Sequence, residues 1–495
     1  MKRQYLPAEA LQAWAKLNSV TFHGVEVKRL SDCDAIDKGS AVLATGPGEG
    51  LESISDDPDL EPEILMKVPS DLILSLQRVE IHAKSDKCLR QVLEALGDFG
   101  KKSRGAVLTF LLLLITHNSV EKGEHVGISS PWTEYIKFLP EAYELPTFYT
   151  LEERELLRGT SLEPALDTKM QSLAREFDRL RDSTLDIPWC QKDWWNAETG
   201  QIDFEDWKAV DAMYRSRAMD LPGTGDAMVP CIDMANHAAG DKTIARYEMD
   251  SEGNAVLQLQ WGQRLREGEE VTITYGDNKG ASEMIFSYGF IDQGVSSAQH
   301  IFLDLDIPDD DPLKPAKRAV CEDGPGVRIS DAGDVQGQRT TWQSKFVWWV
   351  CVNEEDGLEF RVLQSNDGGR ELRVFWKGEQ ITGSRQLCDI LAEDPKWDIF
   401  QLRAVVTIQE RVGNQLALLQ ASNEYVRGWA DKVDDSLIRR SVWDTIMKLR
   451  ILEEKLLRNS NDDLDEKKLE LLESETVQAY LNSHGPGAEI AEDFS

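Results

Sequence analysis

The sequence of 495 residues is poor in features that mark disulfide-linked, zinc-binding and membrane-spanning proteins. Its seven cysteines are scattered and form no C-x-x-C pair, so neither a disulfide framework nor a zinc knuckle is expected. The longest apolar run, Ala106 to Ile115, is too short to span a bilayer and predicts a buried helix. Glu9 and Lys16 interrupt the region where a signal peptide needs apolar residues. We therefore expect a soluble protein without membrane contact, in the cytoplasm, the nucleus or both.

Positive charge is also scarce. The chain has 55 lysines and arginines against 88 aspartates and glutamates, which gives a formal net charge of −33. Such a surface repels phosphate backbones, so direct nucleic-acid binding is not expected. It would attract a protein with a basic exposed segment, although a solubilising surface is the simpler explanation of the charge alone.

The chain lacks the short motifs of common hydrolases, because neither G-x-S-x-G nor H-E-x-x-H occurs. The glycine-rich stretch 46–50 does not predict a phosphate loop. Such a loop must open a helix, and the segment that follows here, SISDDPDLEPE, is acidic and broken by proline.

The pattern of apolar residues predicts a strand-rich part framed by helices. Strands are expected at 25–44 around a polar turn, at 255–261 and 271–275, and in FVWWVCV, LEFRVL and LRVFW between 341 and 376. Helices are expected over most of 72–159, at 165–181, 204–219, 283–288, 400–420 and 435–458, with a break at Ile187-Pro188. Residues 304–335 predict a connector, and the acidic tail after Ser460 is expected to fray.

Three short motifs in the middle of the chain carry the chemical information. They are RSRAM at 215–219, DMANH at 233–237, and VTITYG followed by SYGF at 271–290. Each motif is weak alone: a single arginine is usually on the surface, Asn-His is usually a turn, and a strand tyrosine is usually core. Asp233 and His237, four residues apart, could also be a metal pair on a helix. No third ligand follows at a suitable spacing, so no metal site is expected.

Together, these motifs resemble the SET-domain methyltransferases, in the branch of Rubisco large-subunit methyltransferase and its ribosomal-protein-methylating relatives. That branch carries D-x-x-N-H, a GEE turn into a strand ending in Tyr-Gly, and a second Tyr-Gly-Phe. The matching residues are Asp233, Asn236, His237, Gly268-Glu269-Glu270, Tyr275-Gly276 and Tyr288-Gly289-Phe290. Arg215-Ser216-Arg217 and the W-x-x-Y-I-x-x-L-P motif, with Trp132, Tyr135, Leu139 and Pro140, match as well. The resemblance covers nearly the whole chain.

The resemblance implies an α+β fold. It predicts a β-rich SET core in residues 1–300 with a helical insertion at about 70–200. A connector with short strands would follow at 301–375, and a helical substrate-binding domain at 376–495. It also implies that the Asn-His and tyrosine segments cross in a knot.

The implied activity is transfer of a methyl group from S-adenosyl-L-methionine to a lysine of a non-histone protein, such as a ribosomal protein. No cysteine cluster follows Tyr288, so the chain lacks the zinc-binding segment of many histone-directed SET domains. By analogy, this favours a non-histone substrate. By resemblance, Tyr275 is the catalytic residue. Cofactor contacts are assigned to Lys38, Gly39, Ser40, Arg217, Asn236, His237 and Tyr275. Arg217 would pair with the cofactor's carboxylate, because a guanidinium matches it bidentately.

The substrate residues implied are Asp233, Tyr247 and Tyr288. Asp233 would attract the cationic side chain, and the two tyrosines would line its channel. A lysine has a pKa of about 10.4 in water, and a dry channel beside a sulfonium would lower that pKa and release the proton. A tyrosine hydroxyl suits such a channel because it stays neutral and hydrogen-bonds without water.

Two alternatives remain open at this point. A histidine N-methyltransferase needs less deprotonation but a wider pocket. A catalytically silent SET-like adaptor is favoured by Ala41, which replaces the second glycine of the usual Gly-x-Gly. The joint presence of Tyr275, Asn236, His237 and Arg217 argues against the adaptor. The substrate protein, the number of methyl groups and the oligomeric state are left open.

Overall fold

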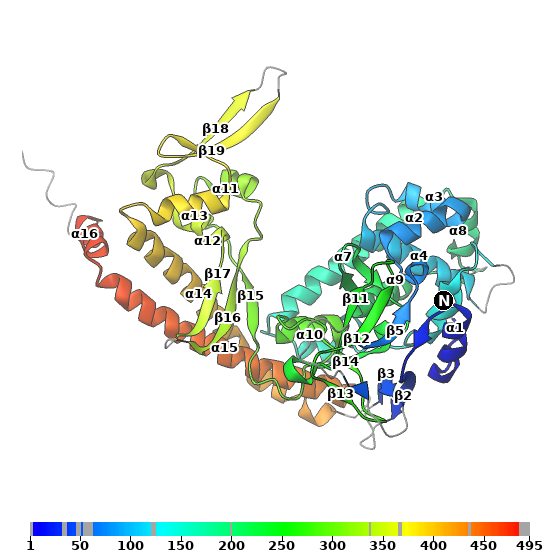
Figure 1. Cartoon of the computed structure of the whole chain (residues 1–495). Coiled ribbons are helices and arrows are strands. Elements are labelled where there is room, and N and C mark those ends of the chain that lie inside the picture. The colour runs from blue at the N-terminus through cyan, green and yellow to red at the C-terminus, as the bar shows by residue number, and fades with distance from the viewer. Residues whose placement is uncertain are drawn as a thin grey trace, which may run out of the picture. The chain divides into compact units, whose positions relative to one another are not determined.

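The computed structural model describes residues 3–31, 37–45, 51–52, 63–119, 125–198, 200–335, 338–364, 369–433 and 437–484. The chain forms two compact units (Figure 1). Unit 1 comprises Met1–Phe148, Leu166–Asn278 and Phe286–Asp292, and unit 2 comprises Tyr149–Ala165, Lys279–Ile285 and Gln293–Ser495. Helix and strand are mixed, which confirms the predicted α+β class.

Unit 1 is built around short strands. A four-stranded antiparallel sheet has the order β1 (Thr21–Phe22), β5 (Ile64–Val68), β12 (Ala255–Leu259) and β11 (Ala245–Met249). A separate hairpin pairs β2 (Val25–Ser31) with β3 (Asp37–Ala44), as predicted. The pair β8 (Ala218–Leu221) and β9 (Gly225–Met228) follows the RSR motif. Leu65, Met66 and Val68 of β5 are buried, which anchors the sheet in the core.

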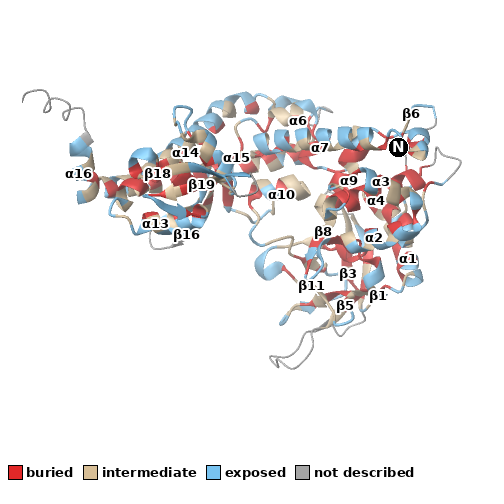
Figure 2. Ribbon diagram, turned by 90° about the horizontal axis from the view of Figure 1, so that it is seen from above, coloured by how far each residue is buried: buried red, intermediate tan, exposed pale blue. Residues whose placement is uncertain are grey.

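Helices surround these strands in unit 1. They include α2 (Leu76–Ser85), α3 (Lys87–Ala95), α4 (Ser103–His117), α5 (Pro131–Tyr135), α8 (Pro188–Asp193), α9 (Phe204–Arg217) and the part of α7 (Leu162–Thr184) from Leu166 onward. The run Ala106–Ile115 is buried throughout within α4, which confirms the expected buried helix (Figure 2). Helix α9 begins at a capping box in which the side chains of Asp203 and Asp206 accept each other's backbone N–H groups.

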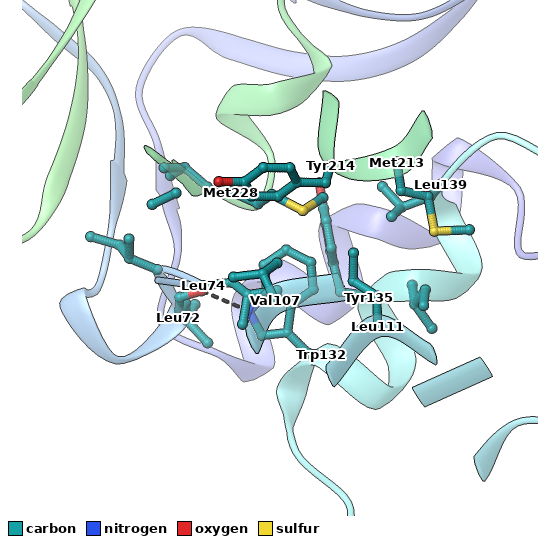
Figure 3. Close-up of a cluster of buried hydrophobic side chains, with 14 of the residues drawn as sticks. Leu72, Leu74, Val107, Leu111, Trp132, Tyr135, Leu139, Met213, Tyr214 and Met228 are labelled. Atoms are coloured by element: carbon teal, nitrogen blue, oxygen red, sulfur yellow. Dashed lines mark hydrogen bonds between the residues drawn. The ribbon is translucent and has the colours of Figure 1, made fainter. Parts of the chain in front are cut away.

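The W-x-x-Y motif contributes to the core of unit 1 (Figure 3). Trp132 packs among apolar side chains from α4, α9 and β9, and its Nε1 donates a 2.8 Å hydrogen bond to the carbonyl of Leu72. Tyr135 is fully buried beside it, with the ring centroids 5.0 Å apart. A buried Trp or Tyr needs a partner for its polar atom, so this cluster fixes where Tyr135 points.

Unit 2 combines two small sheets with long helices. The sheets are β15 (His300–Asp304), β16 (Gly326–Val335) and β17 (Gln338–Gln343), and β18 (Leu358–Gln364), β19 (Arg370–Trp376) and β20 (Glu379–Ile381). The helices include α6 (Leu151–Glu155), α11 (Lys314–Val320), α12 (Phe346–Cys351), α13 (Ser384–Ala392), α14 (Trp397–Arg427), α15 (Arg440–Leu472) and α16 (Glu475–His484). Among the described residues, no helix is long and apolar enough to cross a membrane.

Three predictions for unit 2 were wrong. Residues 304–335 are not a plain connector but carry α11 and β16. FVWWVCV forms helix α12 from Phe346 to Cys351, not a strand. The tail after Ser460 continues in α15 to Leu472, because Leu464 and Leu471 are buried against the unit. The expected connector 301–375 lies wholly within unit 2, which also takes Tyr149–Ala165 from the expected helical insertion.

Candidate active site

A short parallel strand pair brings the two central motifs together. Strand β10 (Asn236–His237) pairs with β14 (Thr272–Ile273), so that Asn236 faces Thr272 and His237 faces Ile273. The N–H of Ala238 donates to the carbonyl of Ile273 at 3.0 Å. The D-x-x-N-H motif therefore lies beside the strand that leads into Tyr275. The same arrangement shows that Asp233, in the 3-10 turn η5 (Ile232–Met234), and His237 do not share a helix.

Tyr275 is held at both its backbone and its hydroxyl. Its N–H donates to His237 Nδ1 at 3.0 Å, and its hydroxyl donates to the carbonyl of Ala235 at 2.9 Å. Its ring stacks on His237 at a centroid distance of 5.2 Å. Burial raises the pKa of Tyr275, although Arg217 acts in the opposite direction. The phenol therefore stays protonated: it donates its single proton to Ala235, and its oxygen can still accept a hydrogen bond.

Tyr288 packs against Tyr275, and Tyr247 lies near Tyr288. The rings of Tyr275 and Tyr288 are 4.5 Å apart, and the Tyr288 hydroxyl reaches the Tyr275 carbonyl at 3.4 Å. Tyr247 lies on β11. Burial raises the pKa of Tyr247, and the neighbouring Tyr288 and Asp220 raise it further. Three tyrosine side chains are thus gathered in unit 1.

Asp233 is the centre of a buried polar network. The Tyr135 hydroxyl donates to its Oδ1, and the N–H of Cys231 donates to the Tyr135 oxygen at 2.8 Å. Arg217 Nη1 donates to the carbonyl of Asp233 at 2.7 Å and lies 3.6 Å from its Oδ2. Burial raises the pKa of Asp233, although Arg217 and Tyr135 favour its charged form.

This geometry does not favour the predicted role of Asp233 in meeting the substrate. Its side chain has no exposed area, and both of its carboxylate oxygens are directed at Tyr135 and Arg217. The sequence could not show this, because Tyr135 comes from a helix nearly 100 residues earlier (98 positions). Asp233 instead holds Arg217. Burial opposes the charge of Arg217, and Asp233 keeps the pKa of that guanidinium above its usual value.

The structure describes Asn236, Gly39 and Ser40 among the other predicted cofactor residues. Asn236 Nδ2 donates to Glu270 Oε1 at 2.7 Å. Gly39 in β3 has φ +75° with open space where a Cβ would lie, so glycine is needed there for its backbone conformation. Ser40 pairs with Arg29 in the hairpin, and Ala41 is fully buried. The side chain of Lys38 and the glycine-rich stretch 46–50 lie outside what the structure describes.

Sequence reasoning missed two residues of this site. His237 Nε2 lies 3.1 Å from Oδ2 of Asp292, which stands two residues after the SYGF motif. Cys231, directly before η5, has φ 72° and ψ −41°, a conformation that residues with a Cβ rarely adopt. Neither residue belongs to a periodic pattern or a motif that could have signalled it. Among the described residues, no three His, Cys, Asp or Glu side chains could jointly hold a metal ion.

The site can be compared with known proteins. No family model matches the chain. A Schizosaccharomyces pombe protein, "SET domain-containing protein 8", is 26% identical over 367 residues, which cover 73% of this chain and 79% of that protein. An Arabidopsis thaliana chloroplastic [fructose-bisphosphate aldolase]-lysine N-methyltransferase is 27% identical over 199 residues, 39% of this chain and 40% of that protein. The chain is homologous to SET-domain methyltransferases.

Relatives with a different acceptor residue are also similar to this chain. The actin-histidine N-methyltransferase of Drosophila melanogaster is 25% identical over 302 residues, 57% of this chain and 49% of that protein. The chain therefore spans about half or less of the length of these two named enzymes, the aldolase-lysine and the actin-histidine methyltransferases.

Solved structures of a SET domain confirm the fold. The SET domain of Rubisco large-subunit methyltransferase, bound to methyllysine and S-adenosylhomocysteine, superimposes with a TM-score of 0.60 at 18% identity, over 98% of this chain and 97% of that one. The same enzyme bound to S-adenosylmethionine gives a TM-score of 0.59 at 17% identity, over 97% and 96% of the chains. The predicted resemblance to SET-domain methyltransferases and the predicted fold are thus confirmed.

Proposed function

We propose that this protein transfers a methyl group from S-adenosyl-L-methionine to the side chain of a lysine in a non-histone protein. The observation that carries the proposal is the placement of Tyr275. Its backbone N–H donates to His237 and its hydroxyl donates to Ala235, which fixes the residue beside the Asn-His strand and Tyr288. Homology to SET-domain methyltransferases makes this tyrosine the natural site of chemistry.

The residues present fit the amino-acid end of the cofactor. When bound, S-adenosylmethionine supplies an electrophilic methyl group. Among the described residues, the buried Arg217 Nε has no hydrogen-bond partner. An unpaired guanidinium N–H is the group that would bind the carboxylate of the cofactor, while Asp233, whose side chain has no exposed area, keeps Arg217 in place. Asn236 would add an amide at the same place, and Gly39 and Ser40 would add backbone groups.

The chain's own side chains would orient the acceptor amine. Aromatic surroundings exclude water, which disfavours the ammonium form and helps a lysine lose its proton to solvent. The Tyr275 hydroxyl would then hold the amine in line for attack. Because orientation alone supplies a large part of the rate in such displacements, the two bonds that fix Tyr275 matter directly.

Electrostatics favours lysine as the acceptor. Glu270 raises the pKa of the Tyr275 hydroxyl, and Asp220 raises the pKa of the Tyr247 hydroxyl. Carboxylates therefore lie near these two phenols. Their charge would draw in a cationic side chain before it is deprotonated. A histidine acceptor is the second candidate, favoured by the similarity to the actin-histidine enzyme. A neutral imidazole gains nothing from these carboxylates.

Isothermal calorimetry with S-adenosylmethionine tests the cofactor site. The intact protein should bind one equivalent, and Asn236→Ala should weaken binding about tenfold, the loss of roughly one charge-assisted hydrogen bond. Asp241→Ala is the matched control, because Asp241 is an exposed aspartate in the turn η6 (Gly240–Lys242) of the same unit. Absence of heat at millimolar cofactor would contradict the proposal and favour a silent adaptor.

A further inference from the structure

The pair formed by His237 and Asp292 has a role that the motifs do not describe. We propose that Asp292 is a positioning residue: its carboxylate fixes the tautomer of His237, and His237 in turn fixes the backbone of Tyr275. The hydrogen bonds among these three residues do not depend on the activity of the protein, whereas their effect on catalysis rests on the proposed function.

The hydrogen bonds run in one direction along this chain of groups. The N–H of Tyr275 donates to Nδ1 of His237 at 3.0 Å, so Nδ1 must carry a lone pair. The ring proton therefore lies on Nε2, which is 3.1 Å from Oδ2 of Asp292. The carboxylate can only accept, so it selects this tautomer. The side chain of His237 is only 4% exposed, which leaves water little access to compete.

The opposite tautomer would disturb Tyr275. A proton on Nδ1 would face the N–H of Tyr275, and two donors cannot share the 3.0 Å between them. The peptide would move away or stay unpaired in a buried place, and either costs free energy. Since the hydroxyl of the same residue bonds to Ala235, a shift of the Tyr275 backbone would move the phenol from its position.

The segment that carries Asp292 is itself held firmly. The carbonyl of Phe286 accepts a 2.5 Å hydrogen bond from Arg215 Nη1. Gly289 has φ +87°, and a Cβ at this position would come within 2.7 Å of the carbonyl oxygen of Glu144. Phe290 packs against His237 with ring centroids 6.1 Å apart. These contacts leave Asp292 a small range of positions, as positioning requires.

Nitrogen NMR of the histidine rings tests the structural claim without any substrate. The chain has seven histidines, so the protein can be labelled with ¹⁵N-histidine and the signal of interest assigned with His237→Gln. The wild type should show a protonated Nε2 and an unprotonated Nδ1. Asp292→Asn should keep this pattern, because the amide oxygen still accepts. Asp292→Ala should shift both nitrogens toward exchange between tautomers. An unchanged pattern in Asp292→Ala, or a protonated Nδ1 in the wild type, would overturn the proposal.

Methyl transfer from tritiated S-adenosylmethionine to cell-extract protein tests the catalytic consequence. Asp292→Ala should lower the rate at saturating cofactor about tenfold while the KM for the cofactor changes less than twofold, because misplaced groups slow the chemical step. Asp292→Asn should restore most of the rate, and the exposed Asp241→Ala is the control. A rate unaffected by Asp292→Ala would refute the positioning role. No transfer by the wild type would instead refute the proposed function, and the NMR result would still decide whether Asp292 sets the tautomer.

Discussion

Tyr275 and Tyr288 give the sharpest contrast between individual residues. Tyr275→Phe removes the hydroxyl that donates to Ala235 at 2.9 Å but leaves the stacked ring in place. We expect methyl transfer to fall about 100-fold or more, the scale of one positioned catalytic group, with cofactor affinity nearly unchanged. Tyr288→Phe is the matched control. Its hydroxyl lies 3.4 Å from the Tyr275 carbonyl, a longer contact than that of the Tyr275 hydroxyl, so the loss should be smaller. Equal losses in both variants would contradict a special role for Tyr275.

Backbone strain at Cys231 should affect the stability of variants at this position. Its φ of 72° disfavours any residue with a Cβ, so Cys231→Gly should be more stable than Cys231→Ala by about 1 kcal/mol. In a helix, alanine is more stable than glycine. The same two substitutions at the exposed Gln171 of α7 therefore serve as the control, with the opposite order of stability expected. Urea unfolding of the four variants measures both differences. An alanine variant at 231 that is the more stable would show that no strain is stored there.

Glu453 predicts a dependence of stability on pH in unit 2. It is fully buried and accepts from both the N–H and the hydroxyl of Ser161. Burial raises the pKa of Glu453 to about 7. Between the unfolded pKa of about 4.3 and that value, only the folded state keeps the proton. The stability from this group is therefore complete below the lower pKa and is lost as pH rises through the upper one.

Glu453→Gln removes this titration while keeping an acceptor for Ser161. Relative to the wild type, the variant should gain about 3 kcal/mol of unfolding free energy between pH 4 and pH 8. Glu454→Gln is the control on the same helix, since hydrogen bonds from Arg458 lower the pKa of Glu454 and the gain should be absent. Denaturant titrations at several pH values measure both. A constant difference across pH for Glu453→Gln would contradict the titration of this group.

Among elements, the segment Tyr149–Ala165 shows how a stretch of the helical insertion is fastened within unit 2. Glu153, with a fully buried side chain, accepts from Arg439 at its N–H, Nε and Nη2, at distances of 3.0, 2.7 and 2.6 Å. Burial opposes its charge, yet these bonds hold the pKa of Glu153 below its usual value. Arg450 Nη1 adds bonds to the carbonyls of Leu156 and Arg158.

Removing Arg439 should therefore destabilise unit 2. Arg439→Met leaves Glu153 buried without its cation, which costs about 3 kcal/mol. Arg427→Met, at the exposed end of α14, should cost less than about 0.5 kcal/mol. Urea unfolding followed by tryptophan fluorescence compares them. Equal midpoints for the two variants would show that the Glu153–Arg439 pair does not fasten this segment.

The elements also show what sequence can predict. The long periodic helices α14 and α15 were correctly expected, because 3.6-residue periodicity over many residues is a strong signal. The short apolar run FVWWVCV was misassigned, since length and period cannot separate a buried helix from a strand. Its helix is favoured by contacts far away in sequence, such as Trp349 Nε1 donating to Ser384 Oγ at 2.8 Å. The acidic end of α15 is ordered for the same reason, because Asp463 binds Arg339 and Thr340.

The candidate site divides in the same way. Motif residues such as Asn236, His237 and Tyr275 could be named from the resemblance. The partner of His237, Asp292, is set by tertiary packing, which no spacing rule expresses. The burial of Asp233 could not be anticipated for the same reason.

At the scale of the whole molecule, the net charge of −33 and the carboxylates near the tyrosines agree in sign. We propose that the protein substrate presents a lysine within a basic exposed segment. Transfer to a basic acceptor should then weaken steeply as salt rises from about 0.05 to 0.5 M, because screening shortens the reach of these charges. Calorimetric affinity for the cofactor over the same range should change little. Salt-independent transfer would argue that surface charge does not select the substrate.

The most direct test of this account is mass spectrometry of the modified residue. Purified protein and S-adenosylmethionine with a deuterated methyl group are incubated with cell extract, and labelled peptides are sequenced. We predict deuterated methyl-lysine in one or a few non-histone proteins with the wild type, and none with Tyr275→Phe. Label on histidine would contradict the assignment of lysine as acceptor. Label that persists in Tyr275→Phe, or no label from a protein that binds the cofactor, would contradict the central claim that Tyr275 directs methyl transfer.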